Sequence, residues 1–269
     1  MFHYFKVMYK ISYACKYFHY LLTSGHSKGY GVHSPFVYDF ITRVLNGPDI
    51  ADYKHIEKLM EELSNDFSEL YILDMGAGSS SGSGKIRTPA SIVKLTSIPP
   101  KYGRLLARLV GWLLPSTIIE LGTGAAISTM YMAITDEKCR IFSIEGCPET
   151  GRLAQQNIAK LNLRNIEIIT GSFNEILPSI LQKIHHDLLV FIDGDHRGDR
   201  LISYVESILP CTNENTVIVL DDIRWSRSME KAWKNIIWRK EISLSIDLFR
   251  MGILLPKRNM FKQHYVIKY

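Results

Sequence analysis

From residue 117 onward, short runs of β-branched and apolar residues alternate with segments of helical periodicity. This alternation indicates a parallel sheet covered by helices, because parallel strands need a long crossover between them. The expected strands span 117–121, 140–145, 166–170, 188–193 and 216–220. The expected helices span 126–134, 148–161, 174–184, 200–209 and 227–238.

The last three apolar runs, 243–249, 252–255 and 264–269, follow one another without room for a helix. Short connections imply antiparallel strands, so we expect the sheet to end in a C-terminal antiparallel hairpin. The predicted fold class is therefore α/β, with a doubly wound, mostly parallel, seven-stranded sheet.

The first 116 residues have a different pattern, which predicts helices. These helices are expected near 4–22, 35–46, 53–64 and 101–113. A Ser/Gly run at 79–84 predicts a loop. We therefore divide the chain into a helical N-terminal extension and lid, 1–100, with a flexible loop near 75–90, and a ligand-binding domain, 101–269.

The net charge of +5 is unevenly distributed along the chain. Residues 1–38 contain four lysines and no acid, and residues 75–119 contain six bases and no acid. Residues 39–74 carry nine acids against three bases, and the remainder is close to neutral. The predicted sheet domain therefore lacks the clustered basicity of a nucleic-acid binder, and the N-terminal half is where an anionic acceptor or surface would bind.

The N-terminal segment combines eight aromatic residues between Phe2 and Tyr20 with Lys6, Lys10 and Lys16. We interpret it as a lid helix packed on the sheet domain, with peripheral membrane contact as an open alternative. It lacks the apolar core of a signal peptide, and no apolar run reaches the roughly 20 residues of a membrane span. The four cysteines show no metal-binding spacing, so a cytoplasmic location is expected.

Two glycine turns follow apolar runs, at 74–78 and at 120–124. Only the second leads into an expected helix and then a strand that ends in an acid, Glu145, which is the arrangement that binds ribose hydroxyls. The third glycine of a dinucleotide fingerprint is replaced by Ile127, and Glu120 directly precedes the turn. These features favour a cofactor without a pyrophosphate that carries a cationic group; the 74–84 segment is predicted to be a loop or lid.

On these motifs, residues 100–269 resemble the class I S-adenosylmethionine-dependent methyltransferases, whose fold is Rossmann-like. The resemblance implies that Gly122, Thr123 and Gly124 line the methionine end of the cofactor and that Glu145 holds its ribose.

Two neighbouring expected strands end in acids, in the sequences Asp193-Gly-Asp195-His196 and Asp221-Asp222. Adjacent parallel strands lie about 4.8 Å apart, so Asp193, Asp221 and Asp222 can converge on one point. Converging carboxylates repel one another and favour a cation such as magnesium, calcium or manganese. Helix capping and cofactor contact without a metal are the open alternatives.

This second pattern resembles the metal-dependent O-methyltransferases of the catechol and caffeoyl-coenzyme A type. The resemblance implies that Asp193, Asp221 and Asp222 bind Mg²⁺ or another divalent cation, and that His196 stands where the family has a lysine base. Asp193 and His196 are the predicted catalytic residues.

The same resemblance extends the cofactor site. Ser128 matches a serine that reaches the cofactor carboxylate, Ser172 lies in the adenine-binding segment, and Ala126 replaces a common glycine. The full predicted cofactor set is Glu120, Gly122, Thr123, Gly124, Ser128, Glu145, Gly146, Ser172 and Asp193. The stretch 31–39 also looks like the leader of a broader branch of bacterial methyltransferase domains, which makes His33 a candidate substrate contact.

We therefore predict an S-adenosylmethionine-dependent methyltransferase that methylates a hydroxyl of a small molecule, with divalent-metal assistance as an option. A nicotinamide-dependent oxidoreductase and a non-catalytic module that docks on a membrane or partner are the alternatives. The identity of the acceptor and a homodimeric state are left open by the sequence.

Overall fold

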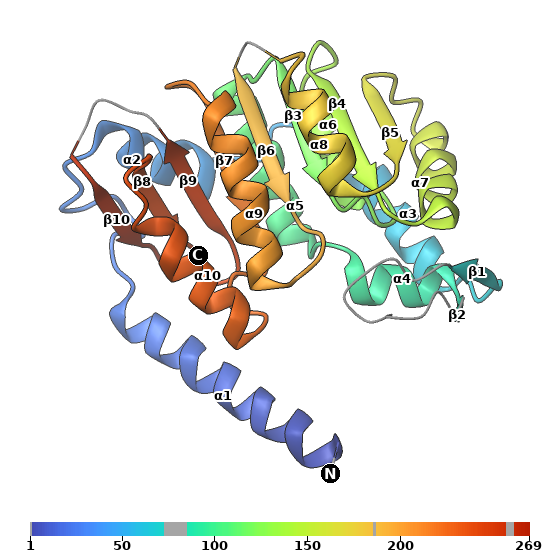
Figure 1. Ribbon diagram of the computed structural model, residues 1–269, viewed down its shortest axis with the longest axis horizontal. Coiled ribbons are helices and arrows are strands. Elements are labelled where there is room, and N and C mark those ends of the chain that lie inside the picture. Colours follow the sequence, from blue (N-terminus) through green and yellow to red (C-terminus); the bar gives the residue numbers. More distant parts are fainter. Residues whose placement is uncertain (1, 73–84, 185–186, 257–260) are drawn as a thin grey trace.

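The structure is a computed structural model that describes residues 2–72, 85–184, 187–256 and 261–269, with side chains described for these residues except 2–12 and 85. Its centre is a mostly parallel sheet, which confirms the predicted fold class (Figure 1). The strands are β3 (Thr117–Leu121), β4 (Arg140–Glu145), β5 (Ile166–Thr170), β6 (Leu188–Ile192), β7 (Val217–Leu220), β8 (Ile242–Asp247), β9 (Gly252–Pro256) and β10 (Gln263–Val266).

Within the described part of the chain the sheet has eight strands, one more than predicted, in the order β10-β8-β9-β7-β6-β3-β4-β5. The expected C-terminal hairpin is present, because β9 pairs antiparallel with both β8 and β7. β10 differs from the expectation, since it lies on the outer side of β8 and runs parallel to it. The short connection from β9 did not reveal that the chain crosses β8 and places β10 at the outer edge of the sheet.

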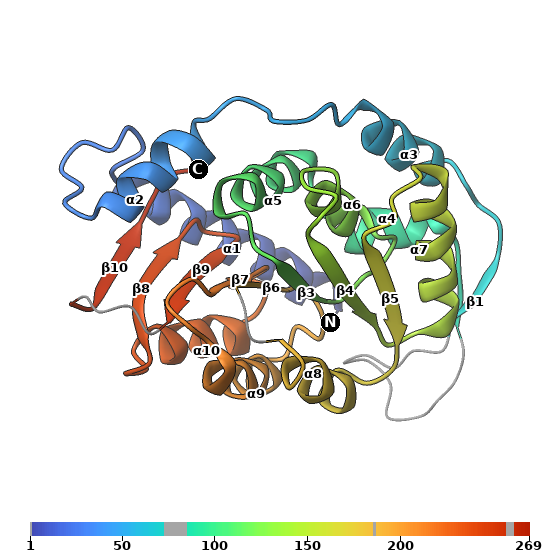
Figure 2. The same ribbon diagram turned by 90° about the horizontal axis from the view of Figure 1, so that it is seen from above.

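Helices cover both faces of this sheet (Figure 2). One face carries α5 (Pro100–Leu113), α6 (Ile127–Ala133) and α7 (Pro148–Lys160), and the other carries α8 (Phe173–Leu181), α9 (Gly198–Ile208) and α10 (Arg227–Ile237). All five residues of β6 and all four of β7 are buried. Their uninterrupted apolar sequence follows from this, because a central parallel strand has no solvent-facing side.

The N-terminal elements are α1 (Phe2–Thr23), α2 (Pro35–Asp39), a π-helical segment (Phe40–Leu45), α3 (Lys54–Ser64), β1 (Leu70–Ile72), β2 (Lys85–Arg87) and α4 (Pro89–Thr96). Buried residues of these helices, such as Phe40 and Ile56, share one core with Ile118 of the sheet. The sequence prediction missed α4, which begins at the reciprocal Thr88 and Ser91 capping bonds. The predicted 74–84 loop lies outside the described residues.

The C-terminal half of α1 packs against the turn between β8 and β9 and against the chain's C-terminus. The Tyr20 hydroxyl donates a hydrogen bond to the carbonyl of Ile267 and accepts one from the backbone N–H of Tyr269 at 3.0 Å. Lys16 forms an ion pair with Glu230 of α10. Among the described residues, no helix combines the length and apolarity that crossing a membrane requires.

Candidate active site

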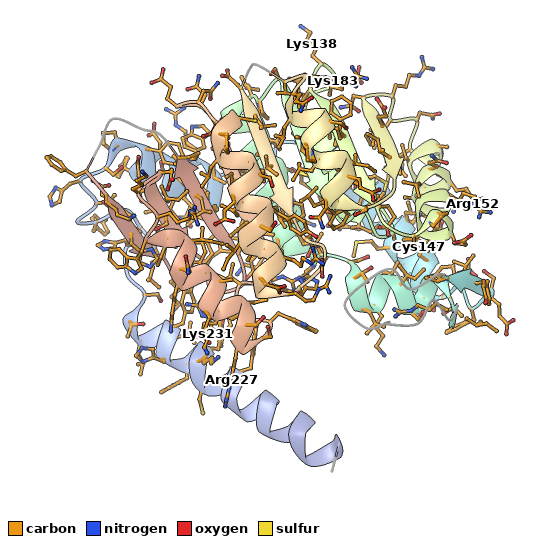
Figure 3. The ribbon with its side chains drawn as sticks, in the orientation of Figure 1. Lys138, Cys147, Arg152, Lys183, Arg227 and Lys231 are labelled. Carbon is orange, nitrogen blue, oxygen red and sulfur yellow. The ribbon has the colours of Figure 1, made fainter. Side chains whose placement is uncertain are left out.

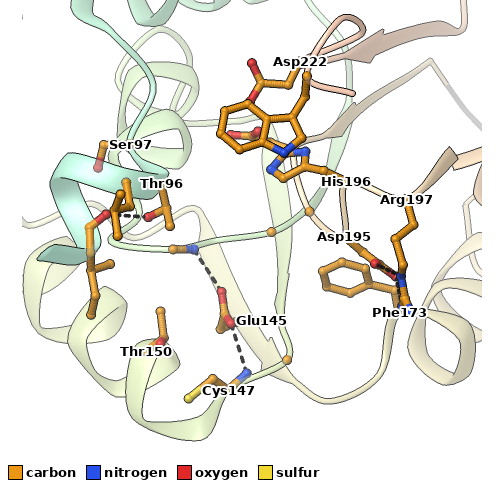
Figure 4. Close-up of a pocket in the computed structure, with 18 of the residues that line it drawn as sticks. Thr96, Ser97, Glu145, Cys147, Thr150, Phe173, Asp195, His196, Arg197 and Asp222 are labelled. Carbon is orange, nitrogen blue, oxygen red and sulfur yellow. Dashed lines mark hydrogen bonds and ion pairs between the residues drawn. The ribbon is translucent and has the colours of Figure 1, made fainter. Parts of the chain in front are cut away.

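A cavity of about 920 Å³ opens at the carboxyl ends of the parallel strands, where ligands bind in open α/β folds (Figure 4). The loops after β3, β4, β5, β6 and β7 form one wall. The other wall comes from α1, α4 and the segment that precedes α5, through residues such as Tyr13, Thr96 and Pro99. Residues of the N-terminal elements therefore complete the lining of the cavity; a lid role stays a prediction.

The glycine turn after β3 forms the floor of the cavity. Gly122 has φ +102°, and a Cβ atom there would lie 2.9 Å from the backbone of Asp193 and Gly194. Only glycine fits such a conformation and such a close approach. Ala126, which replaces the family glycine, still adopts the left-handed conformation at φ 63°, so the loop retains the backbone shape that a glycine would favour.

Glu145, at the end of β4, reaches from one wall of the cavity toward the glycine turn. Its Oε2 accepts a hydrogen bond from the backbone N–H of Gly124 at 2.9 Å, and its Oε1 accepts one from Cys147 at 3.0 Å (Figure 4). Burial raises the pKa of Glu145, and these N–H groups oppose the rise. Cys147, at the start of α7, lines the same cavity, whereas Arg152 further along α7 extends into solvent (Figure 3).

Glu120 lies beneath the cavity and does not line it. It is fully buried, and its carboxylate accepts hydrogen bonds from the hydroxyls of Ser128, Thr129 and Ser143, each at 2.5 Å. Thr123 is also buried and hydrogen-bonds Ser143 at 2.6 Å. These residues support the glycine turn from below. The predicted cofactor residues that do line the cavity are Gly122, Gly124, Glu145, Gly146, Ser172 and Asp193.

An acidic cluster faces Glu145 across the cavity. Asp193, His196 and Asp222 each offer a donor atom, and these atoms lie within 4.8 Å of one another. Burial, followed by the charges of Asp221 and Asp222, raises the pKa of Asp193 well above its ordinary value. Burial also favours the neutral form of His196, in this case by lowering its pKa. The imidazole is therefore neutral at pH 7 and can accept a proton.

Asp221 does not join this group. Arg250, in the turn between β8 and β9, donates from Nε to both carboxylate oxygens of Asp221, at 2.9 and 3.1 Å, and from Nη2 at 2.7 Å. The three carboxylates therefore lie near one another, but Asp221 is paired with an arginine, and metal binding by these acids stays a prediction. The sequence offered little sign of this pairing, because Arg250 is a single base in a mostly apolar hairpin, 29 positions from Asp221.

Two other residues that the sequence singled out lie apart from the acidic cluster. Asp195 accepts hydrogen bonds from Arg197, at 2.5 and 2.7 Å, and from the Tyr204 hydroxyl at 3.0 Å. Burial opposes a fall in its pKa, but these donors lower it overall. His33 is exposed and does not line the cavity, so the structure gives no support for a substrate contact there.

Comparison with known proteins gives related results for sequence and fold. A family described as a methyltransferase domain matches residues 119–223. A catechol O-methyltransferase of Niastella koreensis is 30% identical over 130 residues, which cover 47% of this chain and 58% of the relative. A probable cobalt-precorrin-6B C(15)-methyltransferase (decarboxylating) of Sulfolobus acidocaldarius is 32% identical over 39% of this chain and 52% of that protein.

Among solved structures, an SAH-bound methyltransferase of Podospora anserina superposes with a TM-score of 0.61 at 14% identity, covering 84% of this chain and 98% of that one. The chain therefore has the fold of class I methyltransferases, and its sequence resembles theirs around the predicted site. The match spans little more than half the length of the first two curated relatives.

Proposed function

We infer that this protein is an S-adenosylmethionine-dependent methyltransferase that acts on a hydroxyl of a small molecule. The observation that carries the proposal is the composition of one cavity. The glycine turn lies between Glu145, at the end of β4, and Asp193 and His196, after β6. The cavity volume of about 920 Å³ is at the upper end of the range for ligand pockets, which suits a cofactor together with an acceptor.

The described residues suit this cofactor in three places. The carboxylate oxygens of Glu145, each fixed by one backbone N–H, retain lone pairs that can accept ribose hydroxyls. Gly122 and Gly124 line the cavity next to Glu145, where the methionine end would lie. Ser172 and Phe173 border the cavity after β5, where an adenine would lie. When bound, S-adenosylmethionine supplies a methyl group on a sulfonium, which the buried carboxylate of Asp193 would stabilise.

His196 is the proposed general base. It would take the proton of the acceptor hydroxyl, while the bound cofactor would supply the methyl group to the acceptor oxygen and leave as a neutral thioether. The walls of the cavity hold the reactants in line and exclude water, which is where most of the rate enhancement would arise. Burial keeps His196 unprotonated and available.

Three basic side chains favour an anionic acceptor. Arg87, Lys94 and Arg200 line the cavity. Within the described part of the chain, their side chains have no hydrogen bond or ion pair, so they can bind a carboxylate or phosphate on the acceptor. We expect Arg200→Gln to raise the KM for such an acceptor while the affinity for S-adenosylmethionine stays the same.

Isothermal titration calorimetry with S-adenosylmethionine tests the proposed function. We expect binding by the wild-type chain, a large loss of affinity in Glu145→Ala, and no change in the matched control Glu167→Ala, whose carboxylate pairs with Arg140 on the surface. A wild-type protein that binds no S-adenosylmethionine would refute the proposal. The same titration with NAD⁺ examines the oxidoreductase alternative.

The alternative of a docking module rests on α1 and its exposed Phe18 and Leu22. Sedimentation of the full chain with anionic and with neutral vesicles would test membrane contact: selective sedimentation with anionic vesicles would support it. A homodimer stays a prediction, which light scattering can test.

A further inference from the structure

The three carboxylates that follow β6 and β7 need a cation, and the chain contains one at that place. Asp193, Asp221 and Asp222 bring three carboxylates together, and Asp221 is only 1% exposed. Buried carboxylates are stable only when they are paired, protonated or bound to a metal. The structure supplies a partner in Arg250.

Arg250 is placed to interact with two of these acids. Besides its bidentate bond to Asp221, its Nη2 lies 3.5 Å from an oxygen of Asp222. Its guanidinium lies 5.7 Å from the ring centre of Tyr102. Arg250 also lines the cavity, so its charge acts on the acids and on the space that the acceptor would occupy.

The turn that carries Arg250 is rigidly built. Asp247 accepts hydrogen bonds from Arg224 at 2.8 and 2.7 Å, from the Trp233 indole at 3.1 Å and from the backbone N–H of Phe249 at 2.8 Å. The carbonyl of Arg250 accepts a bond from the N–H of Ile223, next to the acids, at 3.0 Å. The backbone of Arg250 is therefore tied to the loop that it neutralises.

The helix α1 clamps the same turn from the outside. The ring of Phe249, which has a left-handed φ of 70°, lies 5.1 Å from Tyr13, 4.9 Å from Tyr17 and 5.1 Å from Tyr20, measured between ring centres. Aromatic contacts of this kind hold an otherwise unfavourable backbone conformation in place. The N-terminal helix thus fixes the residue that directly precedes Arg250.

We propose that Arg250 is the built-in cation of this site and takes the place that a divalent ion would occupy among Asp193, Asp221 and Asp222. The inference rests on the proposed function, since the cofactor's sulfonium would add the second positive charge near Asp193. A metal held by Asp193, His196 and Asp222 would lie beside the Arg250 guanidinium. The Nη2 atom of that guanidinium is only 3.5 Å from Asp222, which would be one of the metal's ligands. Repulsion between these cations excludes it.

Manganese binding tests the proposal directly, without any substrate. Metal-free wild-type protein is titrated with Mn²⁺, and the free ion is measured by electron paramagnetic resonance. We expect no stoichiometric binding by the wild type and at least about tenfold tighter binding by Arg250→Met, because the competing charge has been removed. Arg250→Lys, which retains the charge, should behave like the wild type.

Arg200→Gln is the matched control. It removes an arginine that lines the same cavity but makes no bond to Asp193, Asp221 or Asp222. Its Mn²⁺ affinity should equal that of the wild type. The proposal is overturned if the wild type binds one Mn²⁺ tightly and Asp193→Asn abolishes that binding. Equal gains in Arg250→Met and Arg200→Gln would overturn it as well. If Arg250→Met does not fold, the wild-type titration still decides.

The proposed function and this inference can fail separately. Calorimetry with S-adenosylmethionine in the presence of EDTA should give the same affinity as without it. Absence of cofactor binding would refute the proposed function and leave the Mn²⁺ result intact. Cofactor binding that requires added Mn²⁺ would overturn the role of Arg250 and leave the proposed function standing.

Discussion

The carboxyl group of Glu120 makes the stability of this protein depend on pH in a way that one substitution can isolate. The side chain is fully buried under the glycine turn, with hydroxyl donors from Ser128, Thr129 and Ser143. Burial raises its pKa from 4.5 to about 7, and the three hydroxyls only partly oppose this. At pH 8 Glu120 is therefore ionised in the folded protein, although its charge is more stable in the solvated unfolded chain.

The size of the effect follows from linkage. Because the pKa of Glu120 is higher in the folded state, its contribution to stability is fully present below pH 4.5 and is lost as the pH rises through 7. The whole shift corresponds to about 3.4 kcal/mol, of which about 2.5 kcal/mol falls between pH 5 and pH 8.

Glu120→Gln preserves the shape of the side chain and removes the titration. A glutamine can still accept from two hydroxyls through its oxygen and donate to the third through its amide. Urea unfolding gives the free energy of unfolding of both proteins at pH 5 and at pH 8. Relative to the wild type, the variant should be about 2.5 kcal/mol more stable at pH 8 than it is at pH 5. Glu167→Gln, on the surface, should show no such change. An equal difference between wild type and Glu120→Gln at both pH values would refute the reasoning.

Three further outcomes follow from local geometry. Gly122→Ala should lower stability by about 1–3 kcal/mol, through a positive φ and a clash with the backbone, and should abolish S-adenosylmethionine binding in calorimetry. Tyr20→Phe should cost about 1–3 kcal/mol in urea unfolding, because its hydroxyl bonds two backbone groups, whereas Tyr17→Phe should cost little. The Cys139 thiol, whose pKa burial raises to about 12, should react with Ellman's reagent only after unfolding, unlike the exposed Cys15. Cofactor binding by Gly122→Ala would contradict the first prediction. Equal losses of stability in Tyr20→Phe and Tyr17→Phe would contradict the second. Rapid labelling of Cys139 in the folded protein would contradict the third.

The sequence by itself determined the fold class and the position of the cavity. Strand and helix periods from residue 117 onward are local properties, and parallel strands necessarily bring their carboxyl ends to one edge of the sheet. For that reason Glu145, Asp193 and Asp222 could be predicted to face one cavity from their places at strand ends. The glycine at 122 was recognisable from its place in a turn between an expected strand and an expected helix; the structure adds that the close backbone approach there permits no side chain.

Only the tertiary structure decided which way the polar groups point and which charges meet. Glu120 turns inward to three hydroxyls instead of facing the cavity, because alternate residues of a strand lie on opposite faces and its face is packed by α6. Asp221 meets Arg250 across 29 positions of sequence, and Phe249 meets α1 across more than 200. Such pairings have no local period, since they arise only when distant elements pack together, and they define the cation of the site and the wall that closes it.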